Sequence, residues 1–317
     1  MKILFMGTPD FAIPTLNAII ESGEEIVGVV TQPDKPKGRG YELLPTPIKA
    51  FALSKGIEVY QPDTLRDEAF AELLEKLAPE LIVVVAYGKI LPENVLNYPK
   101  YGCINVHGSI LPEYRGAAPM QRAIIDGKSE TGVTIMYMEK GLDTGDMLLV
   151  EKCPINENDN FEDIHDRLST LGASALIKTV EILKSGKAER VKQDDSLATY
   201  AAKIEKIDCA LNFNKSAKEL HDLIRGLSPI PLSFTKTPDG KLLKVLESRV
   251  VDNEKIFGKA GEVISVGDDI RVACGKGAIS LLRVLPEGKG RMSAADFVRG
   301  RKIKVGDILL SADNNEK

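Results

Sequence analysis

The sequence lacks tryptophan and is poor in two residues that often carry chemistry, with three histidines and four cysteines among 317 residues. No two cysteines form a C-x-x-C pair, which argues against zinc knuckles and disulfide scaffolds. We expect free thiols in a reducing compartment, and they are Cys103, Cys153, Cys209 and Cys274.

Long apolar runs are also absent. The opening run MKILFM stops at Gly7 and Pro9, so it is too short for the core of a signal peptide. No later stretch approaches the roughly 20 apolar residues that a membrane helix needs. We therefore expect a cytoplasmic protein with no membrane-spanning segment.

An excess of one charge is missing as well, because the net charge is only −4. A general binder of polyanions is therefore excluded. The distribution is uneven, however. From Asp208 onward, 19 Lys and Arg stand against 15 Asp and Glu, a balance of +4, which leaves −8 for residues 1–207. The mildly basic last third indicates an anionic partner.

What the first half does contain is an alternation of short apolar runs and amphipathic stretches. The runs lie at 2–6, 25–31, 81–86 and 101–107, with further candidate strands at 131–138 and 146–150. Such runs are typical of a mostly parallel sheet covered on both faces. We expect an α/β fold whose Rossmann-like first domain spans residues 1–189 and ends with a long helix.

The last third has a different pattern. Residues 190–207 are polar without a clear period, and we expect a linker there. Beyond a helix at 216–227, short β-rich segments alternate with turns, the last of them at 307–310. This spacing is typical of a small barrel, so we expect an OB-like β-barrel over residues 208–317.

The segment GTPDFA, residues 7–12, follows the first predicted strand and opens a helix, as a dinucleotide-binding turn does. The pattern G-x-G-x-x-G is absent, and Pro9 stands where the second glycine would let a pyrophosphate approach. We therefore interpret Gly7 as a tight turn and expect no nicotinamide cofactor.

Polar side chains gather at the end of the strand at 101–107. Because side chains alternate along a strand, Asn105 and His107 share one face, at the edge where open α/β sheets bind ligands. A core histidine bonded to the backbone would explain His107 alone, but burying two polar residues there without a purpose is costly. Asp143, in the loop KGLDTGD, is either a turn residue or the carboxylate that orients the imidazole.

These residues leave more than one chemistry open. One histidine and one aspartate are too few for a metal site, so we expect no metal. A Ser–His–Asp hydrolase built on Ser109 is an alternative, although the G-x-S-x-G elbow is missing. Acyl transfer to an amine suits the trio better, with Asn105 and His107 stabilising an oxyanion and Asp143 tuning His107.

The combination N-x-H-x-S-I-L-P-x-x-R-G-x-A-P, followed by a G-x-D-T-G loop, resembles the folate-dependent formyltransferases. The opening ILFMGTPDFA and the loop QPDKPKGRG are similar to the members whose acceptor is initiator methionyl-tRNA. The resemblance covers essentially the whole chain. It implies transfer of the formyl group of 10-formyltetrahydrofolate to the amino group of that tRNA for translation initiation, without metal.

Site residues follow from the resemblance at matching positions. The catalytic trio is Asn105, His107 and Asp143. The folate pocket is expected to be lined by the segments after two predicted strands, namely Tyr87, Gly88, Ile90, Ser109, Ile110, Leu111 and Pro112.

Basic side chains in two segments are the expected tRNA contacts. The loop at 34–47 is either a solvated surface loop or, by the resemblance, a contact for the acceptor end of the tRNA, and the C-terminal domain would contact phosphates. The residues are Lys35, Lys37, Arg39, Arg299, Arg301 and Lys302.

The sequence departs from the family at two places where tryptophans are frequent, and we expect Cys209 and Ile230 to fill core space there. Two alternative functions stay open: a formyltransferase for a small amine, such as a nucleotide sugar or a glycinamide, and a non-catalytic RNA-binding protein. The basic segments argue against the first and the intact trio against the second. We expect a monomer.

Overall fold

The computed structural model describes residues 1–37, 42–300 and 302–310, so Arg39 and Arg301 lie outside the described residues. The chain forms two compact units. The first comprises Met1–Gly116, Glu130–Pro154 and His165–Tyr200. The second comprises Ala117–Ser129, Ile155–Ile164 and the chain from Ala201 onward. The domain bounds expected from the sequence, 1–189, 190–207 and 208–317, stay a prediction.

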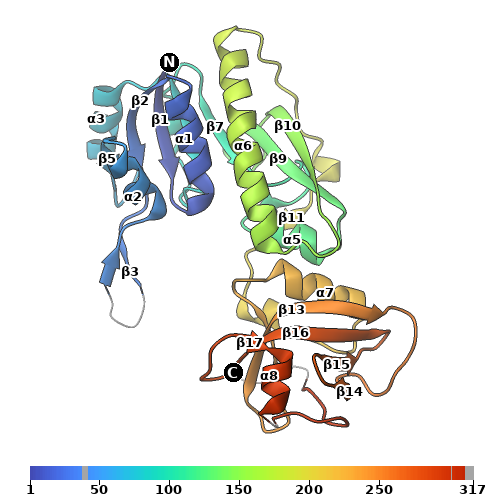
Figure 1. Cartoon of the computed structure of the whole chain (residues 1–317). Coiled ribbons are helices and arrows are strands. Elements are labelled where there is room, and N and C mark those ends of the chain that lie inside the picture. Colours follow the sequence, from blue (N-terminus) through green and yellow to red (C-terminus); the bar gives the residue numbers. More distant parts are fainter. Residues whose placement is uncertain (38–41, 301, 311–317) are drawn as a thin grey trace. The chain divides into compact units, whose positions relative to one another are not determined.

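The first unit is built on a sheet to which, in the described chain, seven strands contribute in the order β10-β9-β7-β6-β1-β2-β5. The strands β1, β2, β5, β6 and β7 run parallel, whereas β9 runs antiparallel to its two neighbours, β7 and β10 (Figure 1). This confirms the expected mostly parallel sheet. The bounds are Lys2–Gly7 (β1), Glu25–Val30 (β2), Val59–Tyr60 (β5), Leu81–Val85 (β6), Cys103–His107 (β7), Glu130–Tyr137 (β9) and Met147–Pro154 (β10).

Helices cover both faces of this sheet. Every residue of β6 is buried, as its continuous β-branched run predicts. On one face, Phe70 and Leu74 of α3 pack with Leu4 of β1. Toward the other, Gly172 lets α6 approach β7 closely. The helices of this unit are α1 (Ile13–Glu21), α2 (Pro47–Ser54), α3 (Glu68–Leu77), α4 (Glu93–Leu96) and α6 (Phe161–Lys184), with the 3₁₀ turns η1 (Asp10–Ala12) and η2 (Asp195–Leu197).

The segment at 34–47, expected to be a loop, is more regular than that. Strands β3 (Lys35–Lys37) and β4 (Glu42–Leu44) pair antiparallel on either side of residues 38–41, which lie outside the described chain. This hairpin extends away from the main sheet (Figure 1). Helix α2 then starts at Pro47, capped by the Thr46 hydroxyl, which accepts a hydrogen bond from the Lys49 amide.

In the second unit, where we expected an OB-like β-barrel, the strands form an antiparallel sheet. Its strands pair in the order β12-β13-β16-β15-β14, with β17 beside β16. Residues 308–310 bridge to Glu262 at one edge and to Lys236 at the other, which closes the sheet. The bounds are Ser233–Lys236 (β12), Leu242–Asp252 (β13), Val263–Val266 (β14), Ile270–Ala273 (β15), Ala278–Pro286 (β16) and Met292–Ser293 (β17).

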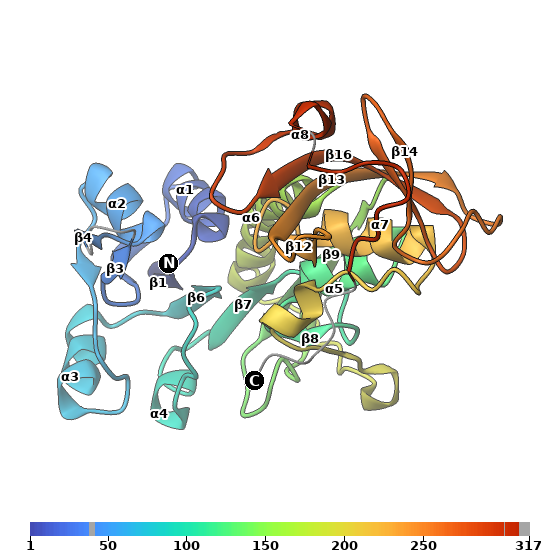
Figure 2. The same ribbon diagram turned by 90° about the horizontal axis from the view of Figure 1, so that it is seen from below.

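Helix α7 (Ala217–Gly226) runs along β13 and β16 (Figures 1 and 2). It buries Leu220 and Ile224 in the core of this unit and packs its other side on α5 (Pro119–Ile125), while α8 (Ala294–Arg299) lies against β16. Cys209, in the turn η3 (Lys206–Cys209), is buried as expected. Ile230, however, is 68% exposed, so the prediction that it fills core space was wrong.

The stretch expected as a linker is held by hydrogen bonds to the first unit. Strand β11 (Tyr200–Ala201) pairs with β8 (Arg115–Gly116). The Val191 and Met147 backbones exchange two hydrogen bonds of 2.8 and 2.9 Å. This polar segment therefore follows the edge of the first unit for much of its length.

Candidate active site

Three loops meet at the carboxyl edge of the parallel sheet. The order of the strands reverses between β1 and β6, and ligands of open α/β sheets bind beyond the carboxyl ends of strands at such a point. There the Tyr87 carbonyl accepts hydrogen bonds from Thr8 Oγ1 (2.9 Å) and Gln32 Nε2 (3.1 Å). The segments after β1, β2 and β6 are thereby tied together.

Asn105 and His107 occupy the same face of β7, as the alternation predicted. Asn105 is half-buried, and within the described chain its side-chain amide makes no hydrogen bond to another protein group. His107 is only 5% exposed. Its Nε2 lies 3.0 Å from the Tyr114 carbonyl oxygen, which can only accept, so Nε2 carries the hydrogen and donates it.

Asp143 lies next to the histidine, as expected. Its Oδ2 is 3.7 Å from His107 Nδ1, too long for a hydrogen bond but close enough for a charge interaction. The same oxygen accepts a 2.8 Å hydrogen bond from the Gly116 amide. Asp143 has a φ of +52°, which a non-glycine residue seldom adopts. The carboxylate is therefore held in place by its loop and by the Gly116 backbone.

Ser109 is fully buried, and both its hydroxyl and its carbonyl form hydrogen bonds within the protein. Its hydroxyl donates a 2.6 Å hydrogen bond to the Glu113 carbonyl, while its carbonyl accepts from Thr134 Oγ1 at 2.7 Å. The Thr134 hydroxyl also accepts from the Leu111 amide at 3.1 Å. The hydroxyl that a Ser–His–Asp hydrolase would need is thus directed to a backbone carbonyl. Sequence reasoning did not identify Thr134, because it resembles any other strand residue.

The segment after β6 contributes mainly backbone to this edge. The Tyr87 ring is 1% exposed and packs in the core, where burial raises the pKa of its hydroxyl to about 12. Gly88 has a φ of +86°, and the side chain of Ile90 is 84% exposed. The segment after β6 thus exposes an apolar side chain to solvent.

Two buried polar residues behind the Asp143 loop were not assigned a role from sequence. They are Arg115, which is 2% exposed, and Gln193, which is 5% exposed. Arg115 belongs to the formyltransferase-like motif of residues 105–119, but Gln193 lies in the polar stretch taken as a linker, where nothing in its neighbours marks it. Both side chains contact each other, and Gln193 also contacts the loop.

The base of the β3–β4 hairpin is held by a charged cluster. Lys49 Nζ lies 2.5 Å from Asp34 Oδ2 and 2.6 Å from Gln61 Oε1. Gln61 Nε2 donates to Asp34 Oδ1 at 2.7 Å. The hydrogen bonds from Lys49 and Gln61 lower the pKa of Asp34. Asp34, one of the charges in the predicted basic loop, is therefore an anchor of that hairpin, which presents Lys35 on its surface.

Arg299 and Lys302, the expected cations of the second unit that the structure describes, are exposed. Arg299 forms an ion pair with Asp296 one turn earlier. A separate pocket of about 600 Å³ in this unit is lined by four arginines. Three of them are exposed and have no ion-pair partner among the described residues, namely Arg249, Arg283 and Arg291.

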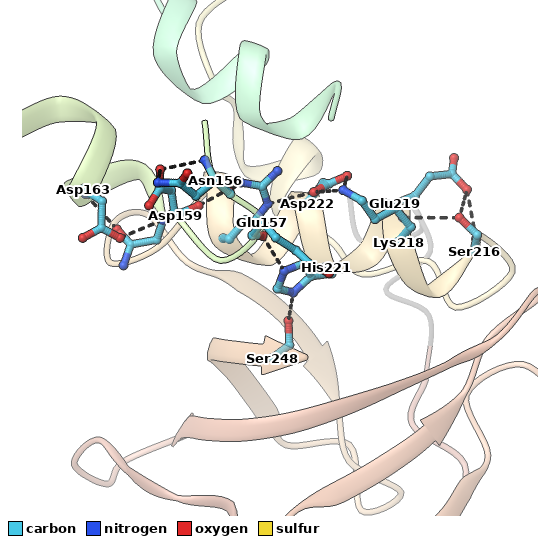
Figure 3. A network of polar contacts seen from close by, with 12 residues as sticks. Asn156, Glu157, Asp159, Asp163, Ser216, Lys218, Glu219, His221, Asp222 and Ser248 are labelled. Carbon is cyan, nitrogen blue, oxygen red and sulfur yellow. Dashed lines mark hydrogen bonds and ion pairs between the residues drawn. The ribbon is translucent and has the colours of Figure 1, made fainter. Parts of the chain in front are cut away.

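The fourth arginine, Arg225, contacts a polar network along α7. Figure 3 shows this network around His221 and Asp222. Arg225 Nε donates to Asp222 Oδ1 at 2.8 Å, and Arg225 Nη1 donates to the Asp159 carbonyl at 2.9 Å. His221 Nε2 donates to the Glu157 carbonyl at 3.2 Å, while Nδ1 accepts from Ser248 Oγ at 3.0 Å. Burial lowers the pKa of His221. These contacts attach residues 156–159 to α7.

In the part of the chain that the structure describes, no group of three or more His, Cys, Asp or Glu side chains could hold a metal ion. No helix in the same part is both long and apolar enough to cross a membrane.

Two family profiles match the chain: Formyl transferase over residues 1–180, and Formyl transferase, C-terminal domain, over residues 203–302. The chain is 48% identical over 316 residues to the methionyl-tRNA formyltransferase of Lachnospira eligens, with 98% of this chain and 99% of that protein covered. It is 47% identical over 314 residues to the methionyl-tRNA formyltransferase of Geotalea uraniireducens, with 99% of each covered.

Solved structures share the fold at lower identity. An N-formyltransferase from Helicobacter canadensis, crystallised with folinic acid and dTDP-3-aminofucose, superposes with a TM-score of 0.66 at 19% identity, covering 89% of this chain and 98% of that one. HypX from Aquifex aeolicus in complex with tetrahydrofolic acid superposes with a TM-score of 0.62 at 17% identity, covering 94% of this chain and 47% of that longer one.

Proposed function

This chain belongs to the formyl transferase family, and from that premise we propose that it transfers the formyl group of 10-formyltetrahydrofolate to the free amino group of methionyl initiator tRNA. Relatives that match it over nearly its whole length carry the name of this reaction. The structural observation that carries the proposal is His107, oriented by the Tyr114 carbonyl and facing Asp143, on the same strand face as Asn105.

The chain's own residues supply hydrogen bonds, orientation and a proton acceptor. When bound, the folate supplies an activated formyl carbon. The Asn105 amide donates to the formyl oxygen, on which negative charge develops during acyl transfer. Because His107 Nε2 is engaged by Tyr114, Nδ1 is the nitrogen that accepts the proton lost by the attacking amine. His107 then returns a proton to the folate nitrogen, which leaves as its bond to the formyl carbon breaks. Asp143 stabilises the imidazolium so formed, whose charge also favours the oxyanion.

The carboxyl edge fits a planar ligand with polar edges. The loop after β7 is held rigid by Thr134, and the segment after β6 presents a glycine backbone and an exposed isoleucine. Such a mixture of backbone polar groups and apolar surface is what a heterocycle with hydrogen-bonding edges requires. We therefore assign the folate to Gly88, Ile90, Ser109, Ile110, Leu111 and Pro112, with Tyr87 contributing its backbone.

A tRNA acceptor is favoured because exposed cations lie on elements of both units. Phosphate contacts from Lys and Arg position a nucleic acid without reading its sequence. In the first unit the assigned cation is the exposed Lys35 of the hairpin, and the same segment contains Lys37 and Arg39. In the second unit the assigned residues are Arg249, Arg283, Arg291, Arg299 and Lys302, together with Arg301.

We also propose that the protein acts as a cytoplasmic monomer. The proposed product would be consumed in translation initiation, which takes place in the cytoplasm. Size-exclusion chromatography with light scattering would check the oligomeric state, and a dimer would contradict this part of the proposal.

An acceptor assay tests the function directly. Purified protein and 10-formyltetrahydrofolate would be incubated with charged initiator tRNA, with free methionine, with glycinamide ribonucleotide and with an amino-sugar nucleotide. We expect rapid formylation of the charged tRNA alone. Faster formylation of a small amine would identify a different acceptor class, and no formylation of any acceptor would overturn the assignment as an enzyme.

A further inference from the structure

A buried polar cluster lies directly behind the loop that carries Asp143. It is formed by the guanidinium of Arg115 and the side-chain amide of Gln193, which are 78 residues apart in the sequence. Both are almost completely buried. Buried polar groups of this kind are costly unless they are hydrogen-bonded, so their partners show what the cluster holds.

Gln193 is bonded to the backbone of the catalytic loop. Its Nε2 donates to the carbonyl oxygens of Asp143 and Gly145, each at 2.8 Å. Its Oε1 accepts from Arg115 Nε at 3.0 Å and from Arg115 Nη2 at 2.8 Å. A guanidinium can only donate hydrogen bonds, so the amide oxygen of Gln193 must face Arg115. The amide nitrogen of Gln193 is thereby turned toward the loop.

The loop needs such support because its own side chains bury little. Lys140 is exposed, and Leu142 is 57% exposed. Asp143 has a positive φ, and a Cβ at Gly145 would lie 1.9 Å from the Tyr137 carbonyl oxygen. The loop is therefore confined to an unusual backbone path that apolar packing does not enforce.

The backbone next to Arg115 contacts Asp143 from a second side. The residue after Arg115 is Gly116, whose amide donates to Asp143 Oδ2 at 2.8 Å. Asp143 is thus held at its carboxylate by the Gly116 backbone and at its carbonyl by the Arg115–Gln193 pair. Both contacts depend on the Arg-Gly dipeptide of β8.

We propose that Arg115 and Gln193 are positioning residues that hold Asp143 against His107. The inference rests on the proposed function for the role of Asp143 and adds the groups through which its geometry is set. Neither side chain touches the reacting atoms, so both act through the loop.

The first test replaces Gln193 by glutamate, which keeps the shape but turns an oxygen toward the two loop carbonyls. A displacement of about 1 Å at a catalytic group lowers rates on the order of 100-fold, so Gln193→Glu should lower kcat by roughly 10- to 100-fold with KM for folate and tRNA nearly unchanged. Lys192→Ala, at the exposed neighbouring position, is the matched control and should keep normal kcat. Normal kcat in Gln193→Glu would overturn the proposal.

A double-mutant comparison separates positioning from a general loss of folding. If Gln193 acts through Asp143, adding Gln193→Glu to Asp143→Ala should cause no further loss of kcat. A full additional loss in the double variant would mean that Gln193 acts elsewhere. Melting curves of all variants would show whether a lowered kcat reflects a smaller folded fraction, which would also contradict the proposal.

An NMR experiment tests the positioning role without using the reaction. The chain has three histidines, so the ring resonances of His107 can be identified with His107→Ala as reference. In Gln193→Glu and Gln193→Leu these resonances should move as they do in Asp143→Ala, while those of His165 and His221 stay. Unchanged His107 resonances would refute the positioning role, whereas an inactive wild type with the expected shifts would refute the proposed function only.

Discussion

At the scale of single residues, the side-chain amide of Asn105 is the oxyanion donor of the proposed mechanism. Asn105→Ala should lower kcat by roughly 100- to 1000-fold, the usual effect of removing one oxyanion donor, with little change in folate binding. Asn97→Ala, an exposed asparagine of the same unit, is the matched control. Steady-state kinetics would check this, and near-normal kcat would remove Asn105 from the mechanism.

Thr134 is the second residue whose side chain has a clear physical task. Its hydroxyl joins the Ser109 carbonyl to the Leu111 amide inside the protein. Thr134→Val keeps the shape but leaves both backbone groups unpaired, which should reduce the free energy of unfolding by about 1–3 kcal/mol. Urea unfolding beside the exposed control Thr170→Val measures this, and equal stability of the two variants would contradict it.

At the scale of elements, the β3–β4 hairpin depends on its anchor. Lys49→Met removes the cation bound to Asp34 and should raise KM for tRNA several-fold, without changing KM for folate. Lys55→Met, an exposed lysine at the end of the same helix, is the control. The pKa of Asp34 is lowered from its ordinary 3.8. Its ion pair with Lys49 therefore stabilises the folded protein above pH 3.8, and this stabilisation is lost as the pH falls through the lowered pKa. An equal rise in both KM values would place the hairpin at the folate.

Helix α7 should make the second unit sensitive to acid. Burial lowers the pKa of His221 from its ordinary 6.5, although Asp222 opposes the effect and Arg225 reinforces it. The unfolded chain then binds a proton more readily than the folded one below about pH 6.5, so stability falls as pH falls. His221→Gln should lose less stability than the wild type between pH 7 and pH 5. Melting curves at pH 7 and pH 5 measure this, and an equal loss of stability in both proteins would contradict it.

At the scale of the whole molecule, tRNA affinity should depend on salt through cations of the second unit. Arg299 is paired with Asp296, so the free arginines Arg249, Arg283 and Arg291 are the better candidates. Replacing all three with alanine should flatten the slope of log affinity against log salt by about 0.9 for each phosphate that is no longer neutralised. The folate KM should stay constant. Replacing Lys55, Lys100 and Lys187 with alanine is the control. Identical slopes in the wild type and in the arginine variant would mean that the three arginines only face solvent.

The sequence by itself determined the local elements and the faces they present. Period-two alternation was enough to place Asn105 and His107 on one side of β7, and continuous β-branched runs were enough to predict buried parallel strands. These features depend on neighbouring residues, so a pattern of a few positions contains them.

Only the tertiary structure decided which distant groups meet. Arg115 and Gln193 come together because β8, the Asp143 loop and the polar stretch near residue 193 lie side by side, and no local pattern specifies that pairing. The same holds for Asp34, whose charge looked like part of a solvated loop until Lys49 and Gln61 proved to bind it. Ile230 was misjudged for the same reason, because burial is a property of the packed chain and not of the residue type.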